Sequence, residues 1–157
     1  MVSFIDTFKF GFITIKNRVA RLGIFSKGLV PLPDSFCNLN ALQELSLFGN
    51  QLRILSNLFG NLISLKFLNL VRNKLTTLPE SFGKLSSLQI LYLNNNMLKS
   101  IPESFGELHN LQRLNLRKNQ LKNLPLSFLK LSNLKMLLIE DNPLDEAAMN
   151  LLKQLKI

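Results

Sequence analysis

The chain has 157 residues, of which 46% are hydrophobic, so it is long enough for one domain with its own core. It carries 19 Lys and Arg against 10 Asp and Glu, and this net charge of +9 suits either an anionic partner or a well-solvated surface. Its single cysteine, Cys37, excludes an internal disulfide framework, and no stretch reaches the roughly 18 uninterrupted apolar residues of a membrane span.

The first residues do not follow the pattern of a secretory signal peptide. Asp6 stands where such a signal carries positive charge, and the apolar run "FKFGFITI" is interrupted by Lys9 and too short. A cytoplasmic location is therefore expected by default. Non-classical secretion leaves no such pattern and stays open.

Residues 1–18 are predicted to be a degenerate half of a repeat unit or an N-terminal cap. Their apolar residues Ile5, Phe8, Phe12 and Ile15 are spaced 3, 4 and 3 apart. The second half of a unit further along the chain has the same spacing, at Leu75, Leu78, Phe82 and Leu85. If this end covers the core poorly, the next strand is an open edge that can pair with a second copy. The chain is then either a monomer or an edge-to-edge dimer through its N-terminal end.

Residues 19–144 form about six repeats with a period of 23 residues and no insertion. Each unit opens with three apolar positions, filled in successive units by Val19, Leu22 and Ile24; Leu42, Leu45 and Leu47; Leu65, Leu68 and Leu70; Leu88, Leu91 and Leu93; Leu111, Leu114 and Leu116; Leu134, Leu137 and Ile139. An asparagine column follows at Asn50, Asn73, Asn96, Asn119 and Asn142, with Lys27 in the first unit. The second half of the units carries a phenylalanine column at Phe36, Phe59, Phe82, Phe105 and Phe128.

The residue types predict how each unit folds. Apolar residues at alternate positions, such as Leu91 and Leu93, indicate a strand with one buried face. Asparagine has both donors and an acceptor, so stacked asparagines can bond backbone groups at each bend. Proline in the return segment, as at Pro79, discourages a long helix. Ser56 interrupts that proline column, so the second unit is expected to return differently.

The pattern L-x-x-L-x-L-x-x-N-x-L, followed by L-P-x-x-F-x-x-L, resembles the leucine-rich repeat in its short, 23-residue form. Repeats of this subclass are found in intracellular Ras-pathway scaffolds and in many bacterial proteins. The resemblance implies an α/β fold, a right-handed solenoid whose parallel strands line the concave face. It also implies a protein-binding function rather than an enzymatic one.

Residues 145–157 are predicted to form a C-terminal capping helix. Asn142 is a candidate N-cap, Pro143 suits the first helical position, and the acidic Asp145 and Glu146 fall in the first turn. An apolar stripe then runs along one helical face through Leu144, Ala148, Leu151, Leu152 and Leu155. Such a stripe can cover the core of the last repeat.

Catalytic, metal and cofactor sites are not indicated. His109 lies in a loop without a placed nucleophile or carboxylate, and Cys37 occupies a column that holds glycine in other units. The acidic residues Glu140, Asp141, Asp145 and Glu146 lack EF-hand spacing, and a helix N-terminus accounts for the last two. We therefore expect no enzyme, no cofactor and no metal.

The variable positions between the repeat leucines form the expected binding surface. In a leucine-rich repeat these side chains point out of the concave face, and here several are apolar or aromatic with arginines beside them. A large apolar patch bordered by charge usually marks a partner site. The candidate residues for binding a partner protein are Phe48, Phe67, Val71, Arg72, Ile90, Tyr92, Arg113 and Arg117.

The basic balance supports an alternative function, the electrostatic binding of nucleic acid or an anionic membrane. Nucleic-acid recognition usually concentrates its charge in a stripe or groove. Here the lysines are spread over turns and the outer face, at Lys74, Lys84, Lys99, Lys122 and Lys130. We therefore interpret most of them as solubilising a leucine-rich solenoid and place the alternative second.

Overall fold

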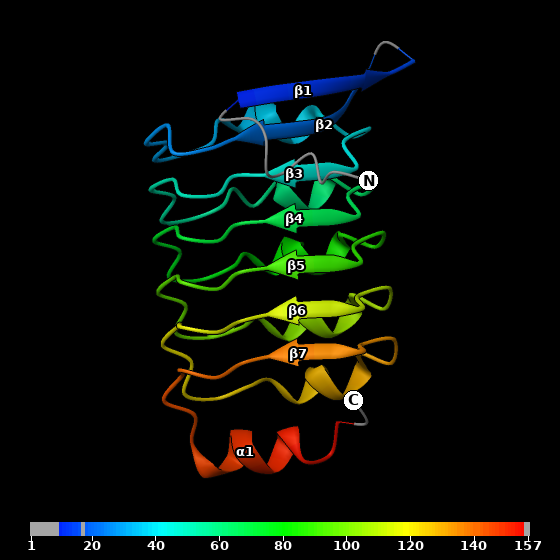
Figure 1. The fold of residues 1–157 in the computed structure, drawn as a ribbon. Coiled ribbons are helices and arrows are strands. Elements are labelled where there is room, and N and C mark those ends of the chain that lie inside the picture. Colours follow the sequence, from blue (N-terminus) through cyan, green and yellow to red (C-terminus); the bar gives the residue numbers. More distant parts are fainter. Residues whose placement is uncertain (1–9, 17, 156–157) are drawn as a thin grey trace.

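The computed structural model describes residues 10–16 and 18–155, which form a short solenoid with one continuous sheet along its side (Figure 1). The sheet has seven strands in the order of the sequence. They are β1 (Phe10–Ile15), β2 (Arg18–Ile24), β3 (Glu44–Ser46), β4 (Phe67–Asn69), β5 (Ile90–Tyr92), β6 (Arg113–Asn115) and β7 (Met136–Leu138). Every pair from β2 to β7 is parallel.

Residues that pair in the sheet are separated by 23 positions, which is the period of the sequence repeat. Leu45 pairs with Leu68, and Leu68 with Leu91, so residues 23 apart lie side by side. The repeat leucines of the middle units are fully buried, among them Leu65, Leu88 and Leu111. The core is therefore one column of stacked layers rather than a set of separate cores, because each unit covers only its neighbours.

The asparagine column forms a ladder of hydrogen bonds, as predicted. The carboxamide oxygen of Asn96 accepts from the backbone N–H of Leu75 at 3.0 Å. Its NH₂ group donates to the carbonyls of Leu70 at 2.9 Å and Leu93 at 3.0 Å. The same three bonds recur at Asn73, Asn119 and Asn142. Backbone groups that the bend removes from the sheet are thus satisfied inside the core.

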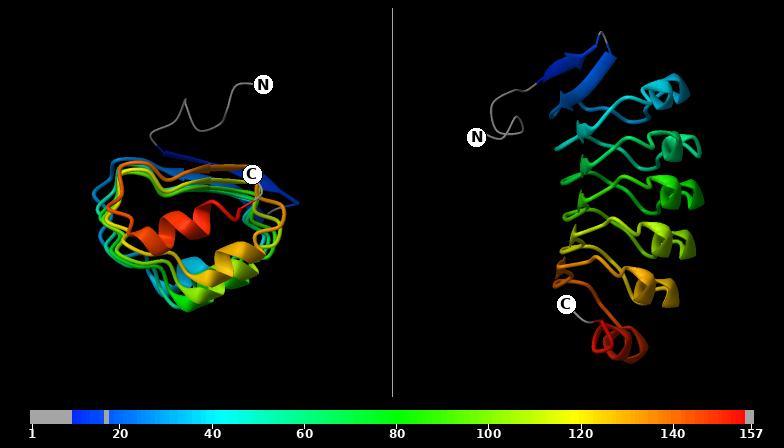
Figure 2. Two further views of the ribbon diagram at one scale, coloured as in Figure 1. Left: turned by 90° about the horizontal axis from the view of Figure 1, so that it is seen from below. Right: turned by 90° about the vertical axis from the view of Figure 1, so that its right-hand side faces the viewer.

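Short 3₁₀ helices on the opposite side of the solenoid complete the units (Figure 2, right). They are η1 (Asp34–Asn38), η2 (Phe59–Asn61), η3 (Glu80–Lys84), η4 (Glu103–Glu107) and η5 (Leu126–Lys130). The phenylalanines of η2, η3 and η4 stack nearly parallel, with ring centroids 6.0 Å apart for Phe59 and Phe82 and 6.1 Å apart for Phe82 and Phe105. A proline in extended conformation precedes four of these helices, as the proline column predicts.

The second unit departs from this pattern, as the interrupted proline column predicts. Its helix η2 has three residues where the others have five, and the residue before it, Leu58, is helical rather than extended. Ser56 takes the place of proline and its hydroxyl bonds both the carboxylate of Asp34 and the N–H of Leu58. A serine therefore organises this turn where a proline ring does so elsewhere.

The N-terminal end is a β-hairpin, so the prediction of a half-repeat is wrong for residues 10–15. Strand β1 pairs antiparallel with β2 instead of returning along the outer side. Phe12 and Ile15 are 60% and 49% exposed, whereas the matching Phe82 and Leu85 are fully buried. Alternating residues of a strand face opposite sides, so a spacing of 3 and 4 cannot bury them on one face. Ile5 and Phe8 lie outside the described residues.

The hairpin also changes the expected open edge. Strand β2 pairs with β1 on one side and β3 on the other, so it is not free to pair with a second copy. An edge-to-edge dimer through this end would have to use β1. Lys16 and Arg18 follow that strand, and both carry a positive charge.

The C-terminal end is covered by helix α1 (Glu146–Leu152), which lies across the last coil when the solenoid is viewed along its axis (Figure 2, left). Ala148 and Leu151 are buried. The predicted N-cap is wrong: Asp145 caps the helix by accepting from the N–H of Ala148 at 2.8 Å, while Asn142 serves the ladder. An asparagine in the ladder register is already committed to backbone groups of the preceding unit, so the next suitable acceptor caps the helix.

Candidate functional site

An apolar cluster lies on the concave face of β4 and β5. Phe67 is the register partner of Ile90, and Tyr92 lies diagonally from Phe67 on the same face. The Phe67 and Tyr92 rings meet edge to face, with centroids 5.7 Å apart and planes at 90°. All three side chains are half-buried, since each covers part of the others. The structure thus brings together three of the residues predicted from the sequence.

A second group lies beside this cluster, on the loops that follow the strands. The guanidinium of Arg72 sits over the ring of Phe48, 5.7 Å from its centroid, in a cation–π contact. Val71 is half-buried next to it. Phe25, which continues this column in the sequence, is only 8% exposed and packs on Gly23, where an added Cβ would lie 2.9 Å from the ring. The apolar surface therefore begins at Phe48.

Cations border the cluster toward the C-terminal end. Arg113 is exposed on β6 as the register partner of Ile90. Arg117 is also exposed, and its Nε lies 3.4 Å from a carboxylate oxygen of Glu140. At the other end of the face, Arg21 pairs with Glu44 at 3.1 Å. Arg72 and Arg113 lie between these two pairs, and neither they nor Lys118, which follows Arg117, has a carboxylate partner among the described residues. The middle of the face is therefore positive.

A polar depression of about 280 Å³ adjoins the cluster between the fourth and fifth units. It is lined by Asn94, Asn95, Asn115, Arg117 and Lys118. Of these, the sequence analysis selected only Arg117. The signal that could have found the others is the change of residue type in two concave columns, where Asn94 follows Val71 and Asn115 follows Tyr92.

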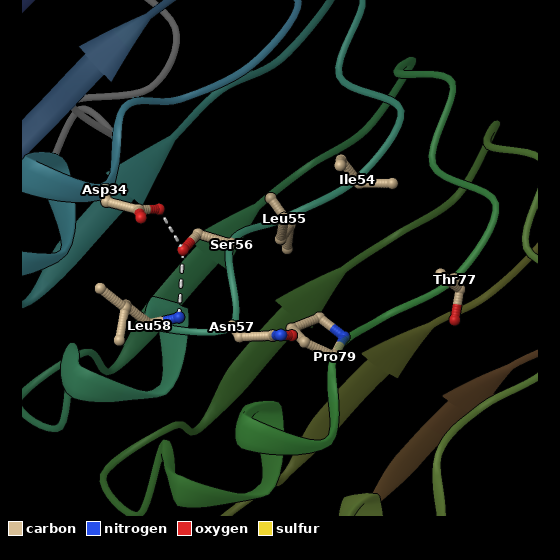
Figure 3. A pocket seen from close by; sticks show the side chains of 8 residues that line it. All are labelled: Asp34, Ile54, Leu55, Ser56, Asn57, Leu58, Thr77 and Pro79. Carbon is tan, nitrogen blue, oxygen red and sulfur yellow. Dashed lines mark hydrogen bonds between the residues drawn. The ribbon is translucent and has the colours of Figure 1, made fainter.

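A larger depression of about 460 Å³ opens on the outer side at the irregular second unit (Figure 3). Its lining includes Asp34, Ile54, Ser56, Leu58 and Pro79. Sequence reasoning did not select it, although Ser56 in the proline column was the available signal. The nearby thiol of Cys37 is buried, and burial, with the adjacent Asp34 carboxylate, raises its pKa. A protonated thiol is a poor nucleophile.

The remaining candidates for chemistry are dispersed. His109 is exposed, with its Nε2 3.4 Å from the carboxylate of Glu107. Of the acidic cluster near the C-terminus, Glu140 pairs with Arg117 and Asp145 caps α1. In the part of the chain that the structure describes, no group of three or more His, Cys, Asp or Glu is placed to hold a metal ion. Within that same part, every helix is too short or too polar to cross a membrane.

Models of leucine-rich repeats match residues 41–62, 63–106 and 86–126. This chain belongs to the leucine-rich repeat family. No curated protein matches it. Among solved structures, a leucine-rich repeat protein of Leptospira interrogans is similar, with 29% identity over 87% of this chain and a TM-score of 0.46. The match covers 47% of that protein, so the chain spans about half of its length.

The general function of the family follows from its fold. Leucine-rich repeat domains generally mediate protein–protein interaction and are typically not enzymes. The fold explains why, because parallel strands at a fixed spacing display variable side chains on one continuous face while the leucines hold the core.

Proposed function

We propose that this chain is a non-enzymatic recognition module that binds a partner protein through its concave face. The observation that carries the proposal is the cluster of Phe67, Ile90 and Tyr92, which lie together on an open sheet face without contributing to the leucine core. Aromatic and aliphatic anchors dominate the energy of protein interfaces when they are central and bordered by polar residues. Phe48 and Val71 extend the apolar area, and Arg72, Arg113 and Arg117 supply the polar border.

The edge-to-face packing of Phe67 and Tyr92 supports the same proposal. Rings held in one orientation lose little conformational freedom when a partner covers them, so less of the binding energy is spent on ordering. The strands beneath are held in one register, because the asparagine ladder and the buried leucine layers follow the same 23-residue offset. The backbone beneath the cluster is therefore held in place by the core rather than by a partner.

The proposal is tested by two triple variants of equal size. Changing Phe67, Ile90 and Tyr92 to Ser removes the anchors and should weaken binding of the partner that the wild type captures by at least about a hundredfold, or about 3 kcal/mol. Changing Lys84, Lys99 and Lys122 to Ser removes three positive charges elsewhere and should leave the affinity within about threefold. Binding is measured by calorimetry, with thermal unfolding to confirm that both variants fold.

The alternative, electrostatic binding of nucleic acid or an anionic membrane, predicts the opposite pattern. The lysine variant would then lose binding while the apolar variant kept it. The affinity of the wild type would also fall steeply with salt, since charge neutralisation releases counterions. An interface centred on apolar side chains is far less sensitive to salt.

A further inference from the structure

We infer that the concave face receives an extended acidic segment of its partner, with one carboxylate of that segment seated in the depression between the fourth and fifth units. This inference rests on the proposed function and adds the chemistry of the partner to it. The depression, of about 280 Å³, is lined by three carboxamides, a guanidinium and an ammonium group, from Asn94, Asn95, Asn115, Arg117 and Lys118. Each of these five side chains can donate hydrogen bonds, and none carries a negative charge.

The donors are available at the depression. The side-chain oxygen of Asn115 accepts from the backbone N–H of Arg117 at 3.1 Å, which turns its NH₂ group to other acceptors. Arg117 meets Glu140 through Nε, and both side chains are about half-exposed, so its terminal amino groups remain able to bind a second carboxylate. Lys118 has no carboxylate partner among the described residues.

The backbone around the depression is tied to the solenoid. The N–H of Asn95 donates to the carbonyl of Arg117 at 3.0 Å, and that of Asn96 donates to the carbonyl of Lys118 at 3.2 Å. Asn95 and Lys118 both have left-handed backbones, with φ of 58° and 54°, at equivalent places in consecutive units. The same turn is thus repeated, so the backbone positions from which the two side chains leave are equivalent in the two units. With the backbone already fixed, only the side chains remain to be ordered when an anion binds.

The depression is continuous with the apolar cluster. Asn115 is the register partner of Tyr92, so the two side chains lie on adjacent strands, about 4.8 Å apart along the solenoid axis. An extended chain crossing the strands advances about 3.3 Å per residue. The depression also lies about two residues further along the strand direction, about 6.6 Å, because Asn94 and Arg117 follow Tyr92 and Asn115 by two positions. The total offset is about 8 Å, so a partner segment whose apolar side chain covers Phe67 and Tyr92 places the residue two or three positions away over the depression.

An acidic protein segment fits these observations better than the other occupants. Nucleic-acid bases stack on open aromatic faces, whereas Phe67 and Tyr92 pack against each other edge to face. A second copy of the chain would bring another net charge of +9 against Arg72, Arg113 and Lys118. A segment with carboxylates next to apolar anchors complements both the charge and the apolar area of this face.

The experiment is a selection from random dodecamer peptides displayed on phage, performed in parallel on three forms of the full chain. The forms are the wild type, R117Q/K118Q, and the control K99Q/K122Q, which loses the same charge outside the concave face. Wild-type and control selections should enrich peptides with Phe, Leu or Tyr two or three residues from Asp or Glu. Synthesised peptides from the wild-type selection should bind R117Q/K118Q at least about tenfold more weakly, and the control within about threefold.

Each outcome decides something. If the R117Q/K118Q selection keeps the apolar residues and loses the acidic ones, the inference holds. If acidic residues are not enriched on the wild type, or persist equally on R117Q/K118Q, the inference is overturned while the apolar anchors still support the proposed function. If no apolar anchor is enriched on any form, or no peptide is enriched at all, both the inference and the proposed function fail. Thermal unfolding of all three forms shows whether the substitutions leave the fold intact.

Discussion

On the outer side of the solenoid, the contact between the first and second units differs from the three contacts that follow it. The helices η2, η3 and η4 each have a glycine against the next unit: a Cβ added to Gly60, Gly83 or Gly106 would lie 2.1, 2.3 or 2.5 Å from the carbonyl oxygen of Ser81, Ser104 or Ser127, respectively. The first unit has Cys37 in this column, and the facing residue of the second unit is Leu58 rather than serine. A buried thiol needs room that a glycine does not.

The consequence is local and visible in the second unit. Helix η2 is shorter than its neighbours, Ser56 replaces the proline, and the depression of about 460 Å³ opens beside them (Figure 3). The strand side is unaffected, since β2, β3 and β4 pair in the same register as the rest. The comparison shows that the outer side of a unit can change without changing the strand side. The leucine layers and the asparagine ladder determine the strand side, whereas close backbone contacts determine the outer side.

The largest effect is expected from removing the C-terminal helix, which would expose the core at the regular end of the solenoid. We propose that residues 145–157 act as a cap at this end, because Ala148 and Leu151 are buried against the last unit. Deleting them should lower the free energy of unfolding by about 5 kcal/mol, since several apolar side chains become exposed at about 2 kcal/mol each. Chemical denaturation and light scattering measure stability and self-association. A truncated protein that is equally stable and monomeric would contradict the capping role.

Two single substitutions on α1 serve as matched controls for that deletion. Leu151 is 4% exposed and Met149 is 48% exposed on the same helix. Leu151→Ser should cost about 3 kcal/mol and Met149→Ser less than about 1 kcal/mol. Equal costs would mean that the helix does not seal the core through its buried side.

The next effect tests the glycine contact itself. Gly83→Ala should destabilise the protein by about 3 kcal/mol, because the new methyl group overlaps a backbone oxygen that cannot move alone. Cys37→Ala, in the same column of the first unit, should cost about 1 kcal/mol, since it only removes a small buried group. Denaturant melts of the two variants provide the measurement. Equal costs would show that the glycine contacts of the later units are no tighter than the contact at Cys37.

A smaller difference is expected between strands. Native-state hydrogen exchange should show β5 protected more than β2 by about tenfold, because β5 has complete repeat units on both sides and β2 is flanked by a hairpin. Amide protection factors at Leu91 and Leu22 give the comparison directly. Equal protection would show that the β1 hairpin seals its end as well as a repeat would.

The smallest effect concerns pH. Burial raises the pKa of the Cys37 thiol above its ordinary value of 9.0, and the carboxylate of Asp34 adds to this. The thiol of the unfolded chain therefore ionises while the folded one stays protonated, so the stability gained from Cys37 is present below pH 9 and is lost as the pH rises further. Unfolding free energies of the wild type and C37A between pH 7 and 10 should converge. Parallel curves would contradict the raised pKa.

The sequence was sufficient for what depends on one unit and its neighbours. The 23-residue period predicted the buried leucine columns, the asparagine ladder and the different turn at Ser56, because each of these depends on a fixed offset and needs no distant partner. The parallel strands were implied by the resemblance to the leucine-rich repeat. The period also placed Phe67, Ile90 and Tyr92 on one face, since register alone makes them neighbours. Whether this face binds a protein stays a prediction.

Only the tertiary structure decided the ends and the fine shape of the surface. The apolar spacing in residues 10–15 resembles that of a return segment, yet these residues pair with β2, because the terminal strand offers free backbone groups that the antiparallel hairpin satisfies. Asp145 rather than Asn142 caps α1 because the ladder claims the asparagine. The depression between the fourth and fifth units and the inward turn of Phe25 onto Gly23 depend on how side chains from different units fill shared space, which no single repeat specifies.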